Sequence, residues 1–308
     1  MYEPKIILVT GGAGFLGSHV SEALRQRWPN AELRIPERPK DDLRDMATCE
    51  RLVKDVDTVV HLAARVGGIG FNQQHPGQLF YDNAAMGIQL MEAARRAGVK
   101  KYVNIGTVCA YPKFTPVPFK EDDIWSGYPE ETNAPYGLAK KMLLVQAQAY
   151  RQEYGFNAIY LLPVNLYGPG DDFDPKSSHV IPALVRRMVE ARDANAPSIE
   201  VWGTGNATRE FCFVRDAANA IVLATEKYDG TEPINIGSGN EISIKDLVET
   251  IKQHVGYTGE ITWNTSKPDG QPRRQLDITR ARKELGYEPK TDFDAGLAET
   301  VRWFEENH

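Results

Sequence analysis

Short apolar runs alternate with amphipathic segments of helical spacing along the first half of the chain. The runs are rich in β-branched residues, and such runs are typical of strands buried on both faces of a parallel sheet. They occupy residues 5–10, 57–64, 101–106 and 158–164, with a shorter candidate strand at 32–35. Helical spacing follows at 18–27, at 81–97 and at about 135–154. This order predicts an α/β fold with a doubly wound parallel sheet.

The first apolar run breaks at a glycine-rich turn with the sequence GGAGFLG. Gly11, Gly14 and Gly17 have the spacing of a dinucleotide-binding turn, which needs a tight bend, a backbone close to a pyrophosphate, and close packing of helix on strand. A predicted strand precedes the turn and a predicted helix follows it, which is the context that the motif requires. We therefore expect a Rossmann domain with a dinucleotide at this turn, in contact with Phe15 and Leu16 as well.

The end of the second predicted strand bears on the choice of cofactor. An NAD site usually has an acidic residue there, about 20 residues beyond the glycines, to hold the ribose hydroxyls. Here Arg34 and Arg38 flank the position instead, and two guanidinium groups suit the 2′-phosphate of NADP. Glu37 could serve the ribose of NAD. We expect NADP, with NAD as the alternative.

A phenol and an ammonium lie four residues apart in the segment NAPYGLAK. Pro135 suits the first turn of a helix, so that Tyr136 and Lys140 share one face. A positive charge beside a tyrosine favours the phenolate, which would let Tyr136 exchange a proton with a carbonyl or hydroxyl near neutral pH. Thr107 follows the strand at 101–106, where its hydroxyl could hydrogen-bond a substrate carbonyl. With the glycine turn, these three groups indicate a catalytic set.

The character of the chain changes after residue 170. Residues 171–196 read as loop and helix, and a short strand follows at 199–202 among scattered cationic and aromatic side chains, which suit phosphates and a base or sugar face. We expect residues 1–166 to form the dinucleotide-binding domain. Residues 167–308 should form mainly a smaller α+β substrate lobe, with a segment near 210–237 returning to the first domain.

Composition and charge limit the kind of partner. The 308 residues carry a net charge of -6 without a long block of one sign, so nothing indicates a nucleic-acid groove or a membrane-surface patch. The three cysteines lack metal-ligand spacing, and the opening apolar run is too short for a signal or a membrane span. We expect a small-molecule ligand, no metal, and a reducing cytoplasmic compartment.

Taken together, the glycine turn, Tyr136 and Lys140 resemble the extended short-chain dehydrogenase/reductase superfamily over essentially the whole chain. Seven segments more narrowly resemble the GDP-L-fucose synthase family, which acts as epimerase and reductase on GDP-4-keto-6-deoxy-D-mannose. In that family's order they are AARVGGIGFNQQHP, TVCAYPK, ETNAPYGLAK, PVNLYGPGDDFDP, SSHVIPALVRR, VWGTGNATREF and SKPDGQPRR. The chain departs from the family in having Thr107 where Ser is usual, and Gly12 and Ala13 where bulkier or basic residues are common.

The resemblance implies a role for each matching residue. Tyr136 would protonate the C4 oxygen during hydride transfer, Lys140 would bind the nicotinamide ribose and tune Tyr136, and Thr107 would hold the carbonyl. Cys109 and His179 match the acid/base pair for inversion at C3 and C5. Such inversion is possible because the C4 ketone acidifies the flanking C–H bonds.

The resemblance also implies ligand contacts and a homodimer. Substrate contacts would come from Arg187, Trp202, Arg209 and Asp269. With the residues predicted from the pattern, the expected cofactor contacts are Gly11, Gly14, Phe15, Leu16, Gly17, Arg34, Arg38, Ala63, Lys140, Pro163, Asn165, Leu166 and His179.

The leading hypothesis is NADPH-dependent conversion of GDP-4-keto-6-deoxy-D-mannose to GDP-L-fucose. One alternative is an epimerase without net reduction, similar to GDP-mannose 3,5-epimerase, and another is a reductase of a different 4-keto nucleotide sugar. The segments SSHVIPALVRR and SKPDG favour the first reading. A non-catalytic dinucleotide-sensing regulator would have no use for Tyr136, Lys140, Cys109 and His179 together.

Overall fold

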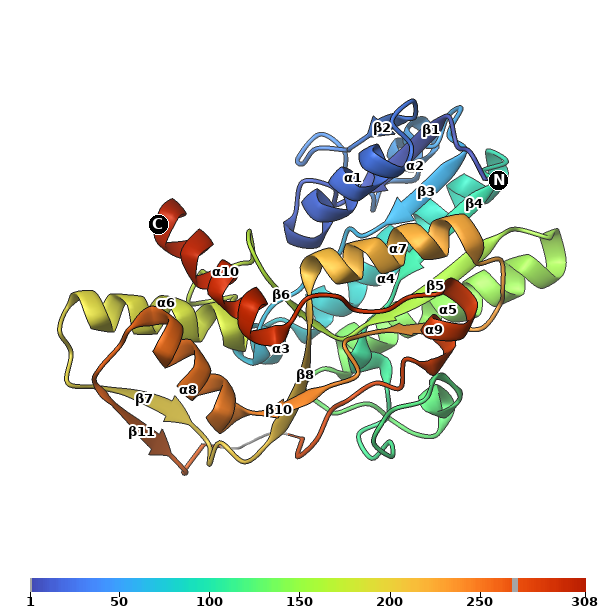
Figure 1. Cartoon of the computed structure of the whole chain (residues 1–308). Helices are drawn as coiled ribbons and strands as arrows, with labels where there is room; N and C mark the ends of the chain where they lie inside the picture. The colour runs from blue at the N-terminus through green and yellow to red at the C-terminus, as the bar shows by residue number, and fades with distance from the viewer. Residues whose placement is uncertain (1, 268–270) are drawn as a thin grey trace.

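The computed structural model describes residues 2–267 and 271–308, arranged as a larger and a smaller part (Figure 1). The larger part is built on a six-stranded parallel sheet with the strand order β2-β1-β3-β4-β5-β9. Its strands are β1 (Ile6–Thr10), β2 (Glu32–Arg34), β3 (Thr58–His61), β4 (Lys101–Ile105), β5 (Ala158–Pro163) and β9 (Ile234–Ile236). The chain winds outward in opposite directions from β1 and β3, so a crevice for ligands is expected at the carboxyl ends of these two strands.

The register of the sheet explains the continuous apolar runs. Leu8 pairs with Val59, Val59 with Tyr102, and Tyr102 with Ala158, in one line across four strands. Every residue of β3 and β4 is buried, because helices cover both faces of the sheet (Figure 1). The parallel α/β fold predicted from the sequence is confirmed.

Helices of the larger part pack in two layers. On one face α1 packs against α7, and on the other α4 packs against α2 and α5. The α5 helix has Pro135 in its first turn and ends at Gly155, whose φ of 66° is a left-handed conformation that glycine adopts readily. The helices are α1 (Phe15–Arg27), α2 (Met46–Leu52), α3 (Ile69–Gln74), α4 (Pro76–Arg96), α5 (Ala134–Tyr154), α7 (Val214–Lys227) and α9 (Thr279–Leu285), with the short 3₁₀ helices η1 (Val108–Ala110) and η2 (Glu121–Trp125).

The smaller part combines two small sheets with three helices. A three-stranded sheet has the order β10-β8-β6, and β11 pairs with β7 in parallel. The α8 helix packs against α6 and α10. The elements are β6 (Asn165–Tyr167), α6 (Val180–Asp193), β7 (Ser198–Trp202), β8 (Thr208–Phe213), β10 (Glu241–Ser243), α8 (Ile244–Val255), β11 (Glu260–Asn264) and α10 (Phe293–Asn307).

Two apolar cores follow this arrangement, and the chain passes between them more than once. Within the segment near 210–237, β8 belongs to the small sheet, whereas α7 and β9 pack in the larger part. Leu276, Ile278, Leu285 and Tyr287 also pack in the larger core. The sequence-based division into residues 1–166 and 167–308 did not anticipate this second return.

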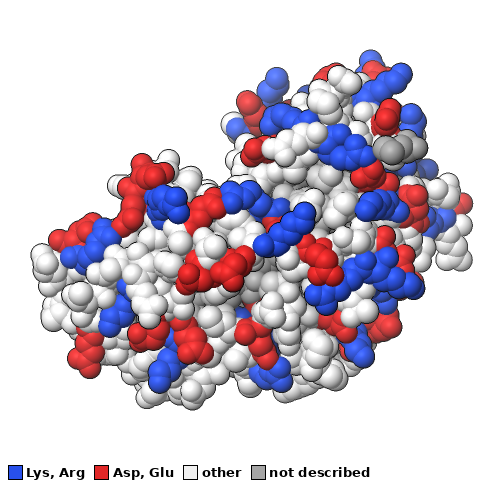
Figure 2. Space-filling model, in the orientation of Figure 1, with Lys and Arg blue, Asp and Glu red and all other residues white. Residues whose placement is uncertain are grey.

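Surface charge, helix hydrophobicity and possible metal ligands add three observations. Lys and Arg side chains are interspersed with Asp and Glu over the face shown in Figure 2. In the part of the chain that the structure describes, no helix is long and apolar enough to cross a membrane. Over the same residues, no group of three or more His, Cys, Asp and Glu side chains is arranged to hold a metal ion.

Candidate active site

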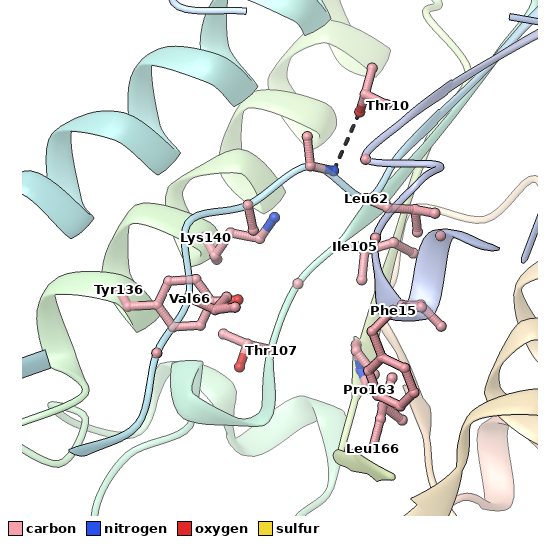
Figure 3. A pocket seen from close by; sticks show the side chains of 18 of the residues that line it. Thr10, Phe15, Leu62, Val66, Ile105, Thr107, Tyr136, Lys140, Pro163 and Leu166 are labelled. Atoms are coloured by element: carbon pink, nitrogen blue, oxygen red, sulfur yellow. Dashed lines mark hydrogen bonds between the residues drawn. The ribbon is translucent and has the colours of Figure 1, made fainter. Parts of the chain in front are cut away.

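A cavity of about 820 Å³ opens at the carboxyl ends of β1, β3, β4 and β5. Thr10, Ala63, Gly106 and Pro163 line it where these strands end, and Figure 3 shows side chains from several elements around the space. The cavity therefore lies at the crevice that the strand order predicts. His179, which comes from the loop before α6, also lines the cavity.

The glycine turn forms a cradle in which Gly11 and Gly17 leave no room for a Cβ atom. Gly11 has a φ of 72°, and a Cβ atom there would lie 2.8 Å from the backbone nitrogen of Ala63. A Cβ atom at Gly17 would lie 1.9 Å from the carbonyl oxygen of Gly11. Gly14 is the N-cap of α1, so the unpaired N–H groups of this helix face the cavity. These residues fit the pyrophosphate of a dinucleotide.

The two arginines predicted for a 2′-phosphate have different surroundings. Arg38 lines the cavity beside Glu37, and its guanidinium contacts the sulfur of Met86 at 3.3 Å. Arg34 does not line the cavity. Its guanidinium is engaged by Glu32 at 2.6 Å and by the carbonyl of Lys54 at 2.7 Å. The structure therefore leaves Arg38 as the arginine positioned for this end of the cavity.

The five side chains expected to carry the chemistry all line this cavity: Thr107, Cys109, Tyr136, Lys140 and His179. Tyr136 and Lys140 project from α5 on the same side as Thr107, which follows β4 (Figure 3). The Thr107 hydroxyl accepts a hydrogen bond from the Cys109 N–H at 3.2 Å, and it is close enough to Tyr136 to lower the pKa of the phenol. Thr107 therefore lies between the phenol and the segment that carries the thiol.

Close backbone packing holds α5 against that segment. A Cβ atom at Gly137 would lie only 2.3 Å from the carbonyl oxygen of Cys109. The same helix is also bonded to β5, because the Tyr160 hydroxyl donates a hydrogen bond to the carbonyl of Lys140 at 2.7 Å. A Cβ atom at Gly106 would meet the Tyr160 ring at 2.4 Å. The two glycines thus bring the helix and the strand end close together.

Burial controls the charges of the phenol and the ammonium. Burial raises the pKa of Tyr136, and negative charge on Cys109 raises it further, while the neighbouring Thr107 hydroxyl lowers it. Burial lowers the pKa of Lys140 to about 8. In this structure burial outweighs the effect expected from Lys140, so Tyr136 keeps its proton at neutral pH while Lys140 remains mostly charged.

His179 faces the cavity from the N-cap position of α6. Surrounding protein atoms lower the pKa of His179, and the negative charge of Asp172 partly offsets this effect. Its loop is tied to the loop after β3, because the N–H of Gly68 donates to the carbonyl of Ser177 at 3.1 Å. The histidine therefore comes from a loop that is fixed to the segment after β3.

Two asparagines of the cavity were not identified from the sequence. The Asn72 amide donates to the Asn133 side chain at 3.1 Å, and both residues line the cavity. The Asn133 amide in turn donates to Glu130 at 2.6 Å. Asn133 precedes Tyr136 in the NAPYGLAK segment, and its place just before a helix was the one signal that could have marked it.

Three of the residues expected to contact the substrate, Arg187, Trp202 and Arg209, do not line this cavity. Arg187 donates to the carbonyl of Glu200, and Arg209 donates to the carbonyl of Thr208 at 2.7 Å. The Trp202 side chain is 65% exposed. Asp269 lies outside the described residues.

The fold, the glycine cradle and the tyrosine and lysine on α5 define a dinucleotide-dependent enzyme of the epimerase and dehydrogenase class. The model of the NAD dependent epimerase/dehydratase family matches residues 7–237, and the chain belongs to this family. Within that class, the chain is similar to GDP-L-fucose synthases. It is 38% identical over 309 residues to the GDP-L-fucose synthase of Sinorhizobium fredii, with 100% of this chain and 98% of that protein covered. It is 44% identical over 250 residues to the probable GDP-L-fucose synthase 1 of Oryza sativa subsp. japonica, with 81% and 76% covered. The resemblance noted in the sequence is confirmed.

Solved structures agree with the fold. A GDP-6-OMe-4-keto-L-xylo-heptose reductase from C. jejuni superposes with a TM-score of 0.93 at 25% identity, covering 100% of this chain and 99% of the other. A GDP-L-fucose synthetase from Naegleria fowleri bound to NADP superposes with a TM-score of 0.87 at 28% identity, covering 100% and 96%.

Proposed function

We propose that this protein converts GDP-4-keto-6-deoxy-D-mannose to GDP-L-fucose by epimerisation at C3 and C5 and NADPH-dependent reduction at C4. The observation that carries the proposal is the convergence of Thr107, Cys109, Tyr136, Lys140 and His179 on one cavity beside the glycine cradle. A reductase needs the phenol and ammonium. Only an enzyme that also inverts carbon centres needs the thiol and imidazole in the same space.

The cofactor site follows from the cradle. Gly11, Gly14 and Gly17 would hold the pyrophosphate, Arg38 the 2′-phosphate, and Lys140 the nicotinamide ribose. When bound, NADPH supplies the hydride that is added to C4.

Epimerisation requires a proton to leave one face of a carbon and another to return on the opposite face. Cys109 and His179 both line the cavity and come from different elements, one from the segment after β4 and the other from the loop before α6. The thiolate of Cys109 would remove the proton next to the C4 ketone. The lowered pKa of His179 makes its protonated form a better proton donor for the other face.

Reduction requires a proton at the C4 oxygen as the hydride arrives. The raised pKa of Tyr136 keeps a proton available for this step, and the Thr107 hydroxyl beside it would help to hold the C4 oxygen. Because negative charge on Cys109 raises the pKa of Tyr136 further, an ionised base and a protonated acid can coexist in the site. The charge on Lys140 would stabilise the phenolate that forms.

The smaller part is proposed as the substrate lobe, with Arg187, Trp202, Arg209 and Asp269 contacting the GDP moiety. The Trp202 ring lies 5.2 Å from the ammonium of Lys267, at the end of β7. An exposed indole can stack on a base or sugar face. Binding of GDP to Trp202→Ala, compared with wild type by calorimetry, would test this assignment, and unchanged affinity would contradict it.

One experiment tests the proposed reaction. Purified protein is supplied with GDP-4-keto-6-deoxy-D-mannose and NADPH, and the product is identified by NMR. GDP-L-fucose is expected. A product reduced at C4 with unchanged C3 and C5 would favour a plain reductase, the class to which the similar C. jejuni heptose enzyme belongs. Epimerised sugar without NADPH oxidation would favour an epimerase without net reduction.

We further propose a homodimer through α4 and α5. These helices pack side by side, and they expose apolar side chains, including Tyr81 at 63% and Val145 at 49%. A second copy of the same helix pair would cover them. Light scattering should give twice the chain mass of 34.4 kDa, and a substitution such as Val145→Lys should shift it towards the monomer. The three free cysteines, Cys49, Cys109 and Cys212, support a reducing, cytoplasmic compartment, which we propose as well.

A further inference from the structure

An arginine from a distant part of the chain reaches the thiol of Cys109. The Nη1 atom of Arg274 lies 4.0 Å from the Cys109 sulfur. The other side of the guanidinium is fixed, because Nε and Nη2 both donate to the side-chain oxygen of Gln271, at 3.3 and 3.1 Å. Gln271 is itself anchored by a bond to the carbonyl of Lys113 at 2.8 Å. The guanidinium is thus held in place with one edge facing the sulfur.

The charge of Arg274 is not neutralised by a carboxylate among the described residues. Its side-chain partners there are the neutral amide of Gln271 and the thiol of Cys109. The neighbouring Arg273 is different, because it forms an ion pair with Glu241 and is 54% exposed. Arg274 is partly buried, and its carbonyl accepts a bond from the N–H of Glu210 at 3.0 Å. A fixed positive charge, without a carboxylate partner in the described part of the chain, therefore lies beside the thiol.

We propose that Arg274 is a positioning residue for Cys109, holding and stabilising the thiolate that removes a proton from the substrate. The proposal rests on the proposed epimerase function. An arginine stays charged at all accessible pH values, and an opposite charge within about 4–6 Å favours the ionised form of a group. A thiol acts as a base only in its thiolate form, so a guanidinium held beside the sulfur would support the reactive species.

The chemical step is balanced without a further reactant. The Cys109 thiolate forms an S–H bond with the proton of C3 or C5, and the electrons of the broken C–H bond move into an enolate whose charge lies on the C4 oxygen. Arg274 remains protonated throughout. Its net effect is smaller than its effect on ionisation, because a stabilised thiolate is also a weaker base, with a Brønsted coefficient of about 0.4–0.5 for thiolate reactions. We expect a rate effect of roughly three- to tenfold.

The arrangement also has a structural consequence. Cys109 follows β4 in the larger part, whereas Arg274 precedes the segment 276–287 that returns from the smaller part. Arg274 can therefore reach the thiol of Cys109 only when this returning segment is folded against the larger part.

The test compares wild type, Arg274→Met, Arg274→Lys and Arg273→Met as full-length proteins. Alkylation of Cys109 by iodoacetamide at pH 7 is followed by mass spectrometry, which distinguishes it from the buried Cys49 and Cys212. Deuterium incorporation at C3 and C5 of GDP-4-keto-6-deoxy-D-mannose is measured in D₂O. Arg274→Met should slow both reactions roughly three- to tenfold, and the loss should shrink at alkaline pH, where a thiol ionises unaided. Arg274→Lys should retain most of both rates, and Arg273→Met should match wild type.

The outcomes separate this proposal from the proposed function. Alkylation of Arg274→Met at the wild-type rate would overturn it, even if deuterium exchange were lost, because Arg274 would then act on the substrate. Equal slowing in Arg273→Met would also overturn it, since general surface charge would be the cause. If alkylation is slowed in Arg274→Met but wild type exchanges no deuterium at C3 or C5, the interaction of Arg274 with Cys109 is supported and the proposed epimerase function is refuted. If Arg274→Met does not fold, alkylation of Arg274→Gln provides the same comparison.

Discussion

Gly137 is the position where a single methyl group should do most damage to the site. It follows Tyr136 on α5 and faces the backbone of Cys109, so its lack of a side chain lets the helix approach the segment after β4. Substitution of Gly137 by Ala would place a Cβ atom 2.3 Å from the Cys109 carbonyl oxygen and 2.9 Å from its carbonyl carbon. Both are backbone atoms, which cannot rotate away as a flexible side chain would.

The structure gives the size of the required movement. Ordinary van der Waals contacts begin at 3.4 Å, so the helix and the Cys109 segment must separate by about 1 Å. A misplacement of this size between reacting groups can cost about 10²-fold in rate. Overpacking typically costs ~1–3 kcal/mol of stability, and the higher helix propensity of alanine offsets up to ~1 kcal/mol. Gly137→Ala should therefore fold, with slightly reduced stability, but reduce the substrate about 100-fold more slowly.

The assay is single-turnover oxidation of NADPH at saturating substrate, with thermal melting measured on the same samples. Gly77→Ala is a matched control, because Gly77 is also in the first turn of a helix, α4, but no atom lies within 4 Å of its added Cβ. It should keep full activity and melt at the same temperature or slightly higher. Turnover of Gly137→Ala within twofold of wild type would refute the argument from close packing.

Three further predictions concern the charges and the acid of the site. Burial lowers the pKa of Lys140 from 10.5 to about 8, so between these pH values the unfolded chain binds more protons than the folded protein. Wild type should therefore gain about 3 kcal/mol of stability relative to Lys140→Met as the pH rises from 8 to 10.5. A difference in stability that stays constant with pH in denaturant melts would contradict this. Arg38→Ala should lose the preference for NADPH over NADH in cofactor titrations, whereas Arg34→Ala should keep it. An equal loss of this preference in both variants would show that the ion pair of Arg34 opens when the cofactor binds. Tyr136→Phe should bind both ligands but reduce ~10²–10⁴-fold more slowly, and Thr107→Ala should lose less; near-normal hydride transfer by Tyr136→Phe would mean that another group is the acid.

Local patterns in the sequence predicted the sheet and the centre of the site. Strands buried on both faces must be continuously apolar, so β1, β3, β4 and β5 were recognisable from their composition. Gly11, Gly14 and Gly17 were recognisable because their spacing follows from the close approach of one short turn to a ligand. The four-residue interval from Tyr136 to Lys140 follows from the pitch of a helix. Each of these features depends on residues that are near each other in the chain.

Features that depend on distant partners were not predictable in this way. Nothing local marks Arg34 as engaged by the carbonyl of Lys54, which comes from another segment. Tyr287 packs in the larger core and bonds to the carbonyl of Gly237, and this return of the chain is decided by long-range packing. The approach of Arg274 to Cys109 spans 165 residues of sequence. Such contacts became visible only in three dimensions.

The most direct test of the proposed function is the fate of deuterium in Cys109→Ser. The substitution barely changes size, but a hydroxyl is far too weak a base to replace a thiolate. Wild type and variant are given GDP-4-keto-6-deoxy-D-mannose and NADPH in D₂O, and the products are identified by NMR. Wild type should yield GDP-L-fucose with deuterium at C3 and C5, and Cys109→Ser should yield a reduced, unepimerised GDP-6-deoxyhexose without deuterium at either carbon. Deuterium incorporation by Cys109→Ser at the wild-type rate would contradict the assignment of Cys109 as the base of an epimerase and reductase.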